Sequence, residues 1–198
     1  MRKIVVQEFV SLDGVMQAPG DNEDTDGGFT QGGWVWPYWE DAIDAYMGES
    51  MREVDTYLLG RKTWQNHGAA FEPMPVGDPL GDMMKAAPKY VVSTTLTDTT
   101  LWRNSSLIRD NVIERVRALK ELPGKNIGID GSSVLVHALA RHDLVDEYAL
   151  LVFPLVLGGG KRVFPEGQRI HLRLVEARPF PSGVALMRYV PERAEGAE

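Results

Sequence analysis

The stretch from residue 126 to residue 164 constrains the fold more than any other part of this sequence. A short apolar segment at 126–129 runs into a turn at 128–133 that is rich in glycine and serine, and a helical pattern and a second apolar segment at 148–153 follow. This order predicts a strand, a helix and a second, parallel strand. In the helix, apolar residues recur at helical spacing and are expected to face the core: Val134, Leu135, Ala138 and Leu139.

The turn between this strand and this helix is a candidate phosphate site. Where a strand ends and a helix begins, backbone N–H groups point outward and the helix dipole is positive. The alternative is an ordinary turn, in which Gly131 supplies a positive φ and Ser132 caps the helix. The residues by themselves leave both interpretations open for Gly128, Asp130, Gly131, Ser132 and Ser133.

A second turn of this kind lies earlier in the chain. Gly60 ends an apolar strand, and Arg61, Lys62 and Thr63 open a helix. Arginine offers phosphate a planar fork and lysine a point charge, although two basic residues on a surface turn can also be merely solvated. A third strand, at 90–92, ends in hydroxyls that suit a phosphate or ribose, or simply a turn: Ser93, Thr94 and Thr95. Two turns of the strand–glycine–helix kind in one chain favour an extended anionic ligand that spans both. Because ligands of open α/β sheets bind beyond the carboxyl ends of strands, we expect all three turns to share one edge of the sheet.

The rest of the chain alternates strands and helices, with no internal repeat and no linker. Apolar patterns predict strands at 3–10, 56–59, 90–92 and 107–108, helices at 37–53 and 111–120, and a hairpin of strands at 170–178 and 184–189. We therefore predict an α/β fold with a single, mostly parallel, twisted sheet flanked by helices, and an antiparallel hairpin at the C-terminus. Residues 1–191 are expected to form one domain, and 192–198 a polar tail.

Aromatic residues gather after a glycine-rich loop at 19–33. Trp34, Trp36, Tyr38 and Trp39 either pack over the edge of the core or form one wall of a pocket for a flat ring. Two carboxylates are singled out by position: Asp13 in the first loop, and Asp41 just inside the helix that follows the aromatic residues. For Asp41 the alternative is favourable placement in the first turn of a helix.

Charge and composition argue against several classes of function. The 198 residues carry a net charge of −7, which disfavours nucleic acid as a partner. There is no cysteine to form a disulfide, a thiolate metal site or a nucleophile, and the spacing of the four histidines does not suit a metal. The N-terminus has no apolar signal segment, and the apolar run at 148–157 contains a proline and is too short to span a membrane. We expect a cytoplasmic protein without a metal site or a membrane partner.

Several of these segments also resemble known families. The residues LLGRKTW at 58–64 resemble the GR-x-TW turn of dihydrofolate reductases. Gly131-Ser132-Ser133, LVDEY at 144–148, FPLVLG at 153–158 and GKRVF at 160–164 resemble the reductase domain of the bifunctional riboflavin-biosynthesis deaminase–reductase. SLDG at 11–14 is similar to the start of stand-alone members of this superfamily. The resemblance covers most of the chain and is weakest at 19–33.

The resemblance implies a dihydrofolate reductase-like fold that binds NADPH. It assigns the pyrophosphate and 2′-phosphate to Gly60, Arg61, Lys62 and Thr63, and the adenosine end to Ser93, Thr94 and Thr95. The turn formed by Gly128, Asp130, Gly131, Ser132 and Ser133 would hold the pyrophosphate, with Asp130 as an alternative acceptor for a ribose hydroxyl. The first loop would pass close to the nicotinamide through Leu12, Gly14 and Val15.

The activity implied is hydride transfer from NADPH to a small heterocyclic or ribosylamino-pyrimidine substrate, as in 5-amino-6-(5-phosphoribosylamino)uracil reductases, with dihydrofolate as the second choice. Asp13 or Asp41 would orient or protonate the substrate, and Trp36 and Trp39 would line its pocket. The zinc-binding HxE…CxxC of the deaminase half is missing, which excludes deamination. The resemblance also implies a homodimer. The alternative is a dinucleotide or small-molecule binding protein without turnover on the same fold.

Overall fold

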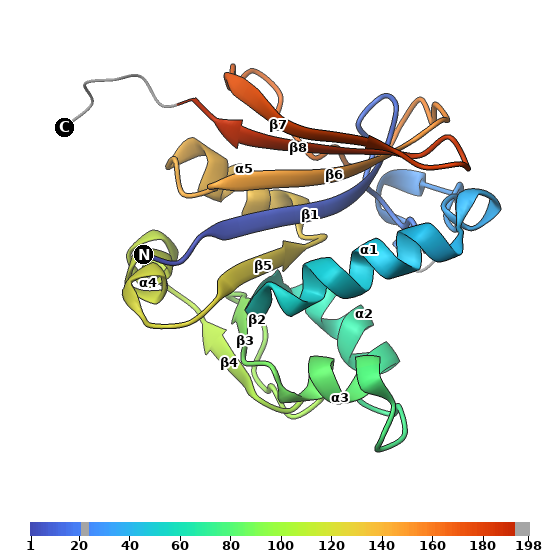
Figure 1. Ribbon diagram of the computed structural model, residues 1–198. Helices are drawn as coiled ribbons and strands as arrows, with labels where there is room; N and C mark the ends of the chain where they lie inside the picture. The colour runs from blue at the N-terminus through green and yellow to red at the C-terminus, as the bar shows by residue number, and fades with distance from the viewer. Residues whose placement is uncertain (21–23, 193–198) are drawn as a thin grey trace.

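In the computed structural model, which describes residues 1–20 and 24–192, the chain is built around one eight-stranded sheet (Figure 1). The strand order is β4-β3-β2-β5-β1-β6-β8-β7; pairs from β4 to β6 are parallel, whereas β8 pairs antiparallel with both β6 and β7. The strands are β1 Ile4–Ser11, β2 Val54–Gly60, β3 Lys89–Val92, β4 Ser105–Ile108, β5 Asn126–Asp130, β6 Glu147–Phe153, β7 Leu172–Pro179 and β8 Ala185–Pro191. The predicted fold class, a mostly parallel sheet with a C-terminal antiparallel hairpin, is confirmed.

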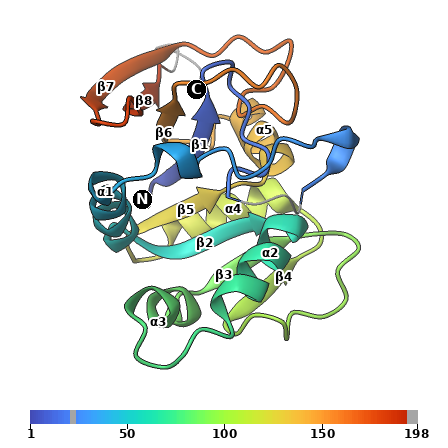
Figure 2. The same ribbon diagram turned by 90° about the vertical axis from the view of Figure 1, so that its right-hand side faces the viewer.

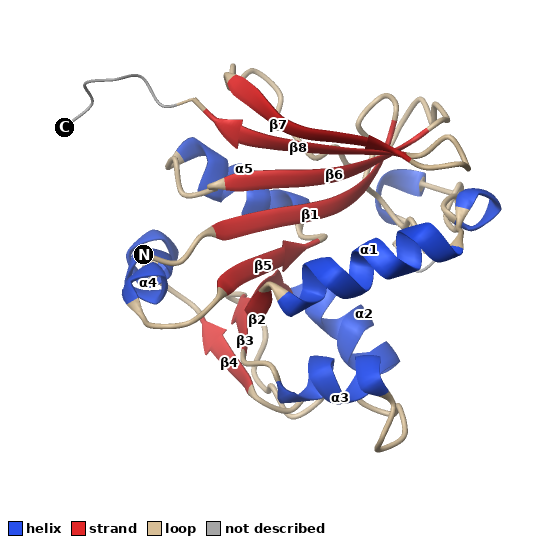
Figure 3. Ribbon diagram, viewed as in Figure 1, coloured by secondary structure: helices blue, strands red, loops and turns tan. Residues whose placement is uncertain are grey.

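Helices flank this sheet on both sides (Figure 3). They are α1 Asp41–Arg52, α2 Arg61–Phe71, α3 Pro79–Ala86, α4 Val112–Glu121 and α5 Ser133–Arg141, with the short 3-10 helices η1 Asp26–Gly28 and η2 Trp36–Tyr38. Asp78 caps α3, since its carboxylate accepts a hydrogen bond from Gly81 N at 2.7 Å. Among the described residues, no helix is both long enough and apolar enough to cross a membrane.

Alternation along β1 divides the core between the two faces of the sheet. Ile4, Val6 and Val10 point to one face, where they pack with Val116 of α4 and Leu139 of α5. On the other face, α2 and α3 cover β2 and β3, and α1 covers β6 and β8. Figure 2 shows the two layers edge-on, with α1 and α5 on opposite sides of the sheet.

The helix predicted from 37 to 53 begins later than expected. Pro37 lies in η2, and the helix itself starts at Asp41, because Trp39 and Glu40 are extended. Glu40 is held by a distant partner: its carboxylate accepts hydrogen bonds from both the backbone N–H and the hydroxyl of Ser182, in the turn between β7 and β8. This long-range contact breaks a pattern that was locally helical.

The predicted inner face of α5 is also partly wrong. Val134 is 80% exposed, and the buried side chains of this helix are Leu135, Val136, Leu139 and Ala140. Because the helix begins at Ser133, its first turn directs Val134 away from the sheet. Val134 instead lies beside the turn that ends β5.

Candidate functional site

The carboxyl ends of the parallel strands bring two of the predicted turns into direct contact. Gly60 ends β2, and α2 begins at the next residue; Asp130 ends β5, and α5 begins three residues later. Ser132 Oγ accepts a hydrogen bond from Gly60 N at 2.8 Å, and Thr63 Oγ1 accepts from Ser132 N at 3.1 Å and from Ser132 Oγ at 3.0 Å. These three bonds join segments about 70 residues apart into one junction, which we call the α2–α5 junction (residues 60–63 and 130–133).

The junction leaves the first amides of both helices without a capping side chain. Gly60 has no side chain to cap α2, and Ser132 directs its hydroxyl to Gly60 and Thr63 rather than to its own helix. The first N–H groups of a helix have no partner inside the helix, and the helix dipole makes this end positive. The two N-termini therefore form a surface suited to an anion, and the exposed Arg61 and Lys62 lie on it.

The bend of the β5–α5 turn depends on left-handed backbone at two successive residues. Gly131 has φ +65° and Ser132 has φ +61°. A Cβ at position 131 would lie 2.8 Å from Thr63 Oγ1, so both the backbone angle and the space require glycine. Gly128, by contrast, lies buried inside β5 against Val54 and Tyr57, which explains that glycine by packing. Its role in cofactor binding stays a prediction.

In the third predicted turn, the Ser93 hydroxyl binds the backbone of the turn itself. Ser93 follows β3, and its Oγ accepts hydrogen bonds from Thr95 N at 3.2 Å and Leu96 N at 3.0 Å. Thr94 and Thr95 are exposed beside it. Because β3 pairs with β2, this turn lies at the same edge of the sheet as the α2–α5 junction, and its contact with adenosine stays a prediction.

Asp13 braces two loops against each other. Its Oδ1 accepts hydrogen bonds from Ser11 Oγ at 2.6 Å and Leu157 N at 3.1 Å, and its Oδ2 accepts from Gly158 N at 2.9 Å. The Ser11 hydroxyl is the largest cause that lowers the pKa of Asp13, so this carboxylate stays ionised near neutral pH. These contacts favour a bracing role over proton donation. The same turn leaves Leu12 68% exposed and buries Val15, with Gly14 at φ +81° between them.

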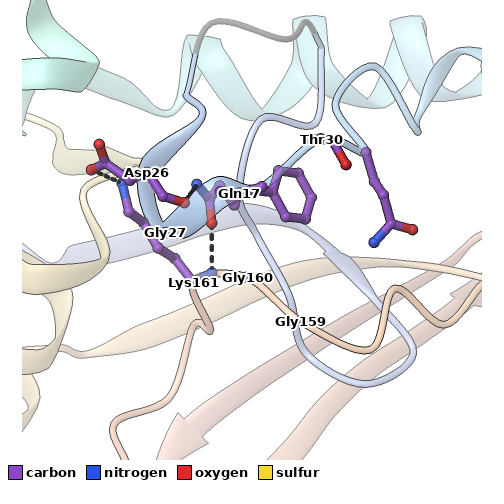
Figure 4. Close-up of a pocket in the computed structure, with 10 residues that line it drawn as sticks. Gln17, Asp26, Gly27, Thr30, Gly159, Gly160 and Lys161 are labelled. Carbon is purple, nitrogen blue, oxygen red and sulfur yellow. Dashed lines mark hydrogen bonds and ion pairs between the residues drawn. The ribbon is translucent and has the colours of Figure 1, made fainter.

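A cleft of about 470 Å³ lies beside this loop (Figure 4), which is within the size range of small-molecule sites. Lys161 lines it, and the Lys161 ammonium donates to Asp24 at 2.6 Å and to Asp26 at 2.8 Å. Asp26 also binds Lys62 Nζ, and these two lysines lower the pKa of Asp26 to about 2. Asp26 therefore links the cleft to the basic side of the α2–α5 junction. The cleft is lined by Gln17, Asp26–Gly28, Phe29, Thr30, Gln31, Gly159, Gly160 and Lys161.

A histidine–carboxylate pair lies at the end of β5. His67 Nε2 is 3.2 Å from Asp130 Oδ2, and His67 Nδ1 is 3.0 Å from the carbonyl oxygen of Thr63. A carbonyl only accepts, so Nδ1 carries a hydrogen, and Nε2 faces the Asp130 carboxyl. Partial burial raises the pKa of Asp130, and the charge of His67 offsets part of that rise. An imidazole and a carboxyl therefore lie within hydrogen-bond distance of each other, close to the α2–α5 junction.

The aromatic cluster divides into core and surface. Trp34 is buried against Phe153 at 5.3 Å between ring centroids, and Trp39 packs edge-on against Phe9 at 5.4 Å. Trp36 is 58% exposed and donates its indole N–H to Gly20 O. Asp41 is exposed in the first turn of α1, as its placement near a helix N-terminus allows. The roles of Trp36, Trp39 and Asp41 toward a substrate stay predictions.

Two residues with notable surroundings were not predicted from the sequence, although its patterns contain a signal for each. Glu8 occupies a core position in the alternation of β1, and an acid there interrupts an otherwise apolar face. His67 follows Thr63 by four residues, the spacing that puts two side chains on one face of a helix. The contacts of Asp26 with Lys62 and Lys161 join three separate segments, and no local pattern indicates them.

Comparison with known proteins places this geometry in a family. The model of the RibD C-terminal domain matches residues 2–186. The chain belongs to the RibD C-terminal domain family. The predicted relation to the reductase domain of riboflavin biosynthesis is thus confirmed, and with it a reductase as the type of protein.

One curated relative and two solved structures agree with this assignment. The protein YyaP of Bacillus subtilis (strain 168) is 32% identical over 194 residues, which cover 95% of this chain and 94% of YyaP. The deaminase/5-amino-6-(5-phosphoribosylamino)uracil reductase of Thermotoga maritima matches with a TM-score of 0.64 at 14% identity, over 96% of this chain and 57% of that one. Dihydrofolate reductase from Enterococcus faecalis, complexed with NADP(H), matches with a TM-score of 0.62 at 14% identity, over 96% and 97%. At these identities the two structures show the fold, which is that of dihydrofolate reductase.

Proposed function

We propose that this protein is an NADPH-dependent reductase that transfers hydride to a small heterocyclic substrate. The first candidate is a ribosylamino-pyrimidine such as 5-amino-6-(5-phosphoribosylamino)uracil, and dihydrofolate is the second. The observation that carries the proposal is the α2–α5 junction, where two helices begin side by side with uncapped amides. Membership of the RibD C-terminal domain family supports the reductase chemistry, and the enterococcal complex with NADP(H) supports the cofactor.

The residues of the junction fit a dinucleotide. The first amides of α2 and the amides of Ser133 and Val134 bind the pyrophosphate. Thr63 Oγ1 accepts two hydrogen bonds from Ser132, so the hydrogen of the Thr63 hydroxyl is left for a phosphate oxygen. Arg61 and Lys62 bind the 2′-phosphate, for which Lys62 exchanges its present partner Asp26.

Reduction of a C=N or C=O bond needs a proton as well as a hydride. Bound NADPH supplies the hydride, and the protein orients the substrate and excludes water. The candidate donor of the proton is the His67–Asp130 pair at the end of β5, where burial raises the pKa of Asp130. Trp36 and Trp39 face the heterocycle, and Asp41 orients it.

Titration with cofactor tests the proposal. NADPH and NADH are each added to the purified protein, and the fluorescence of its five tryptophans is followed. Changing Arg61 and Lys62 to alanine should weaken NADPH binding at least about tenfold, because charge-assisted hydrogen bonds contribute about 1.5–3 kcal/mol, and should change NADH binding far less. Arg117→Ala, an exposed change on α4, serves as the matched control and should leave both affinities unchanged.

Three outcomes decide the matter. Equal loss of NADPH and NADH affinity would show that Arg61 and Lys62 do not bind the 2′-phosphate. No binding of either cofactor at millimolar concentration would overturn the reductase. Tight NADPH binding without turnover of pyrimidines or pterins would favour the alternative, a dinucleotide-binding protein on the same fold.

The assembly is part of the proposal. We expect a homodimer, because the chain resembles the reductases of riboflavin biosynthesis. Light scattering on a sizing column measures the mass directly, and a value near twice the chain mass of 22.0 kDa is expected. A monomer at all concentrations would contradict it.

A further inference from the structure

The imidazole of His67 needs neighbours that fix the plane of its ring. Rotation about the bond that carries the ring is broad and roughly two-fold in histidine, so the side chain by itself does not decide which nitrogen faces which partner. In this structure Nδ1 lies 3.0 Å from the carbonyl oxygen of Thr63, and Nε2 lies 3.2 Å from Asp130 Oδ2. The two contacts require one orientation of the ring, and the surroundings of His67 must maintain it.

Two aromatic rings lie nearly parallel to the imidazole of His67. Phe71, one helical turn further along α2, stacks on it with 5.5 Å between the ring centroids and 14° between the planes. Trp102, in the loop between β3 and β4, stacks at 6.3 Å and 12°. Phe71 belongs to the same helix as His67, whereas Trp102 comes from a distant segment. Trp102 is therefore the ring through which the rest of the fold limits rotation of the imidazole.

A glycine inside α2 makes room for Trp102. A Cβ at Gly68 would lie 3.1 Å from Trp102 Cβ and 3.4 Å from Leu101 Cγ. Glycine is a poor residue for the interior of a helix, and the backbone of Gly68 is not left-handed, so the conformation does not require it. The close approach of the loop to the helix, at the residue next to His67, is the physical reason for glycine at this position.

Charged side chains hold Trp102 in this place. The carboxylate of Glu72, at the end of α2, accepts hydrogen bonds from Arg103 N at 3.2 Å and from Arg103 Nε at 2.6 Å, which fixes the loop to the helix. The Lys89 ammonium lies over the indole, 4.4 Å from the ring centroid, and donates to Met84 O at 2.7 Å. Tryptophan is the side chain whose ring attracts a cation most strongly. Trp102 is fully buried, so its orientation is set on several sides.

We propose that Trp102 is a positioning residue for His67, whose indole limits rotation of the imidazole and keeps Nε2 on Asp130. This inference rests on the proposed function, because it takes the His67–Asp130 pair as the proton donor. It also accounts for a buried indole whose Nε1 has no hydrogen-bond partner among the described residues, since local departures from ideal packing are expected where a site must be held. Trp102 is fully buried and acts through His67 alone.

The tautomer of His67 reports the orientation of its ring in the cofactor-free protein. Nitrogen-15 NMR distinguishes Nδ1–H from Nε2–H at a pH where the imidazoles are neutral, and His67→Phe identifies the signal among the four histidines. The wild type should show the Nδ1–H form, because the carbonyl of Thr63 only accepts. Trp102→Leu should show a mixture of both forms. Trp102→Phe keeps a ring beside His67 and should resemble the wild type.

Turnover separates a positioning role from a merely structural one. In Trp102→Leu, kcat should fall at least about tenfold while the NADPH dissociation constant stays within about twofold, because a small misplacement of a reacting group slows the chemical step. Trp102→Phe should keep kcat within about threefold of the wild type. Val91→Ala, a cavity in the same buried cluster, is the matched control; it should lower the melting temperature and leave kcat and the tautomer unchanged.

Combination with His67→Phe completes the test. In that background Trp102→Leu should not lower kcat further, because the two side chains act as one unit. An equal further loss there, or a wild-type tautomer in Trp102→Leu, would overturn the inference. If the wild type reduces no candidate substrate but the tautomer still responds to Trp102→Leu, the proposed function fails and the positioning of His67 stands.

Gly68→Ala covers the case in which Trp102→Leu does not fold. The new methyl group pushes Trp102 away from α2, whereas alanine itself favours the helix. This variant should therefore fold and show the mixed tautomer of His67. A wild-type tautomer together with wild-type kcat in Gly68→Ala would then contradict the inference.

Discussion

Changing Gly131 to alanine would put a methyl group into the centre of the α2–α5 junction. The new Cβ would lie 2.8 Å from Thr63 Oγ1 and 2.9 Å from Thr63 Cγ2, distances that a real Cβ does not tolerate. The backbone angle would also be strained, because φ at this residue is +65°. Either Thr63 or the turn must move, and each movement disturbs the hydrogen bonds to Ser132.

The size of the effect follows from two separate costs. A left-handed backbone costs a residue with a side chain about 1–2 kcal/mol relative to glycine. Forcing an extra methyl group into a packed site costs a further 1–3 kcal/mol or so. The free energy of unfolding should therefore fall by about 2–5 kcal/mol, and for a chain of this length each kcal/mol lowers the melting temperature by about 2–4 °C.

Gly167→Ala is the matched control. Gly167 has φ +73°, nearly the same as Gly131, but no atom lies within 4 Å of its ideal Cβ. Urea unfolding should show only the backbone cost of about 1–2 kcal/mol for this variant. The difference between the two variants measures the clash with Thr63, and NADPH affinity should fall in Gly131→Ala alone.

Thr63→Ala supplies the decisive comparison. If the clash is real, adding Thr63→Ala to Gly131→Ala should cost less than the sum of the two single changes, because the space for the methyl group is then free. Equal destabilisation of Gly131→Ala and Gly167→Ala, with strict additivity in the double variant, would refute the reasoning from packing.

Two further changes test the neighbours of the junction. His67→Phe keeps a ring that can stack on Phe71 and Trp102 but removes both nitrogens. The kcat should therefore fall about 100-fold or more while NADPH affinity is retained, and an unchanged kcat would count against the His67–Asp130 pair as the proton donor. Asp26→Asn releases Lys62 from an exposed ion pair. Because such pairs are weak, NADPH affinity should rise only about two- to fivefold in a fluorescence titration; weaker binding would show that Asp26 orders the site rather than competing for Lys62.

The order and type of most elements followed from the sequence alone. Apolar runs and helical spacing predicted the parallel strands, the C-terminal hairpin and most of the helices, because these patterns reflect which side of each element is buried. Glycine after an apolar run also predicted where β2 and β5 end. The turns at Gly60 and Gly131 could be identified because a sharp change of direction restricts the residue that can occupy it.

Local pattern failed where a distant residue decided the outcome. The apolar spacing to which Ile43 and Tyr46 belong predicts a helix that begins at residue 37. In the structure α1 begins at Asp41, because Ser182, in the hairpin turn, holds Glu40. The apolar spacing also predicts that Val134 faces the core, whereas α5 begins at Ser133 and leaves Val134 exposed.

The residues of the candidate site were identified from the sequence, but their connections were not. Gly60, Thr63 and Ser132 were each singled out by local pattern, whereas the hydrogen bonds among them exist only because β2 and β5 are neighbours in the sheet. The same pairing brings His67 to Asp130. A chain encodes the period of each element within a few residues, whereas the order of strands and their register depend on packing among segments far apart, and it is these that assemble the site.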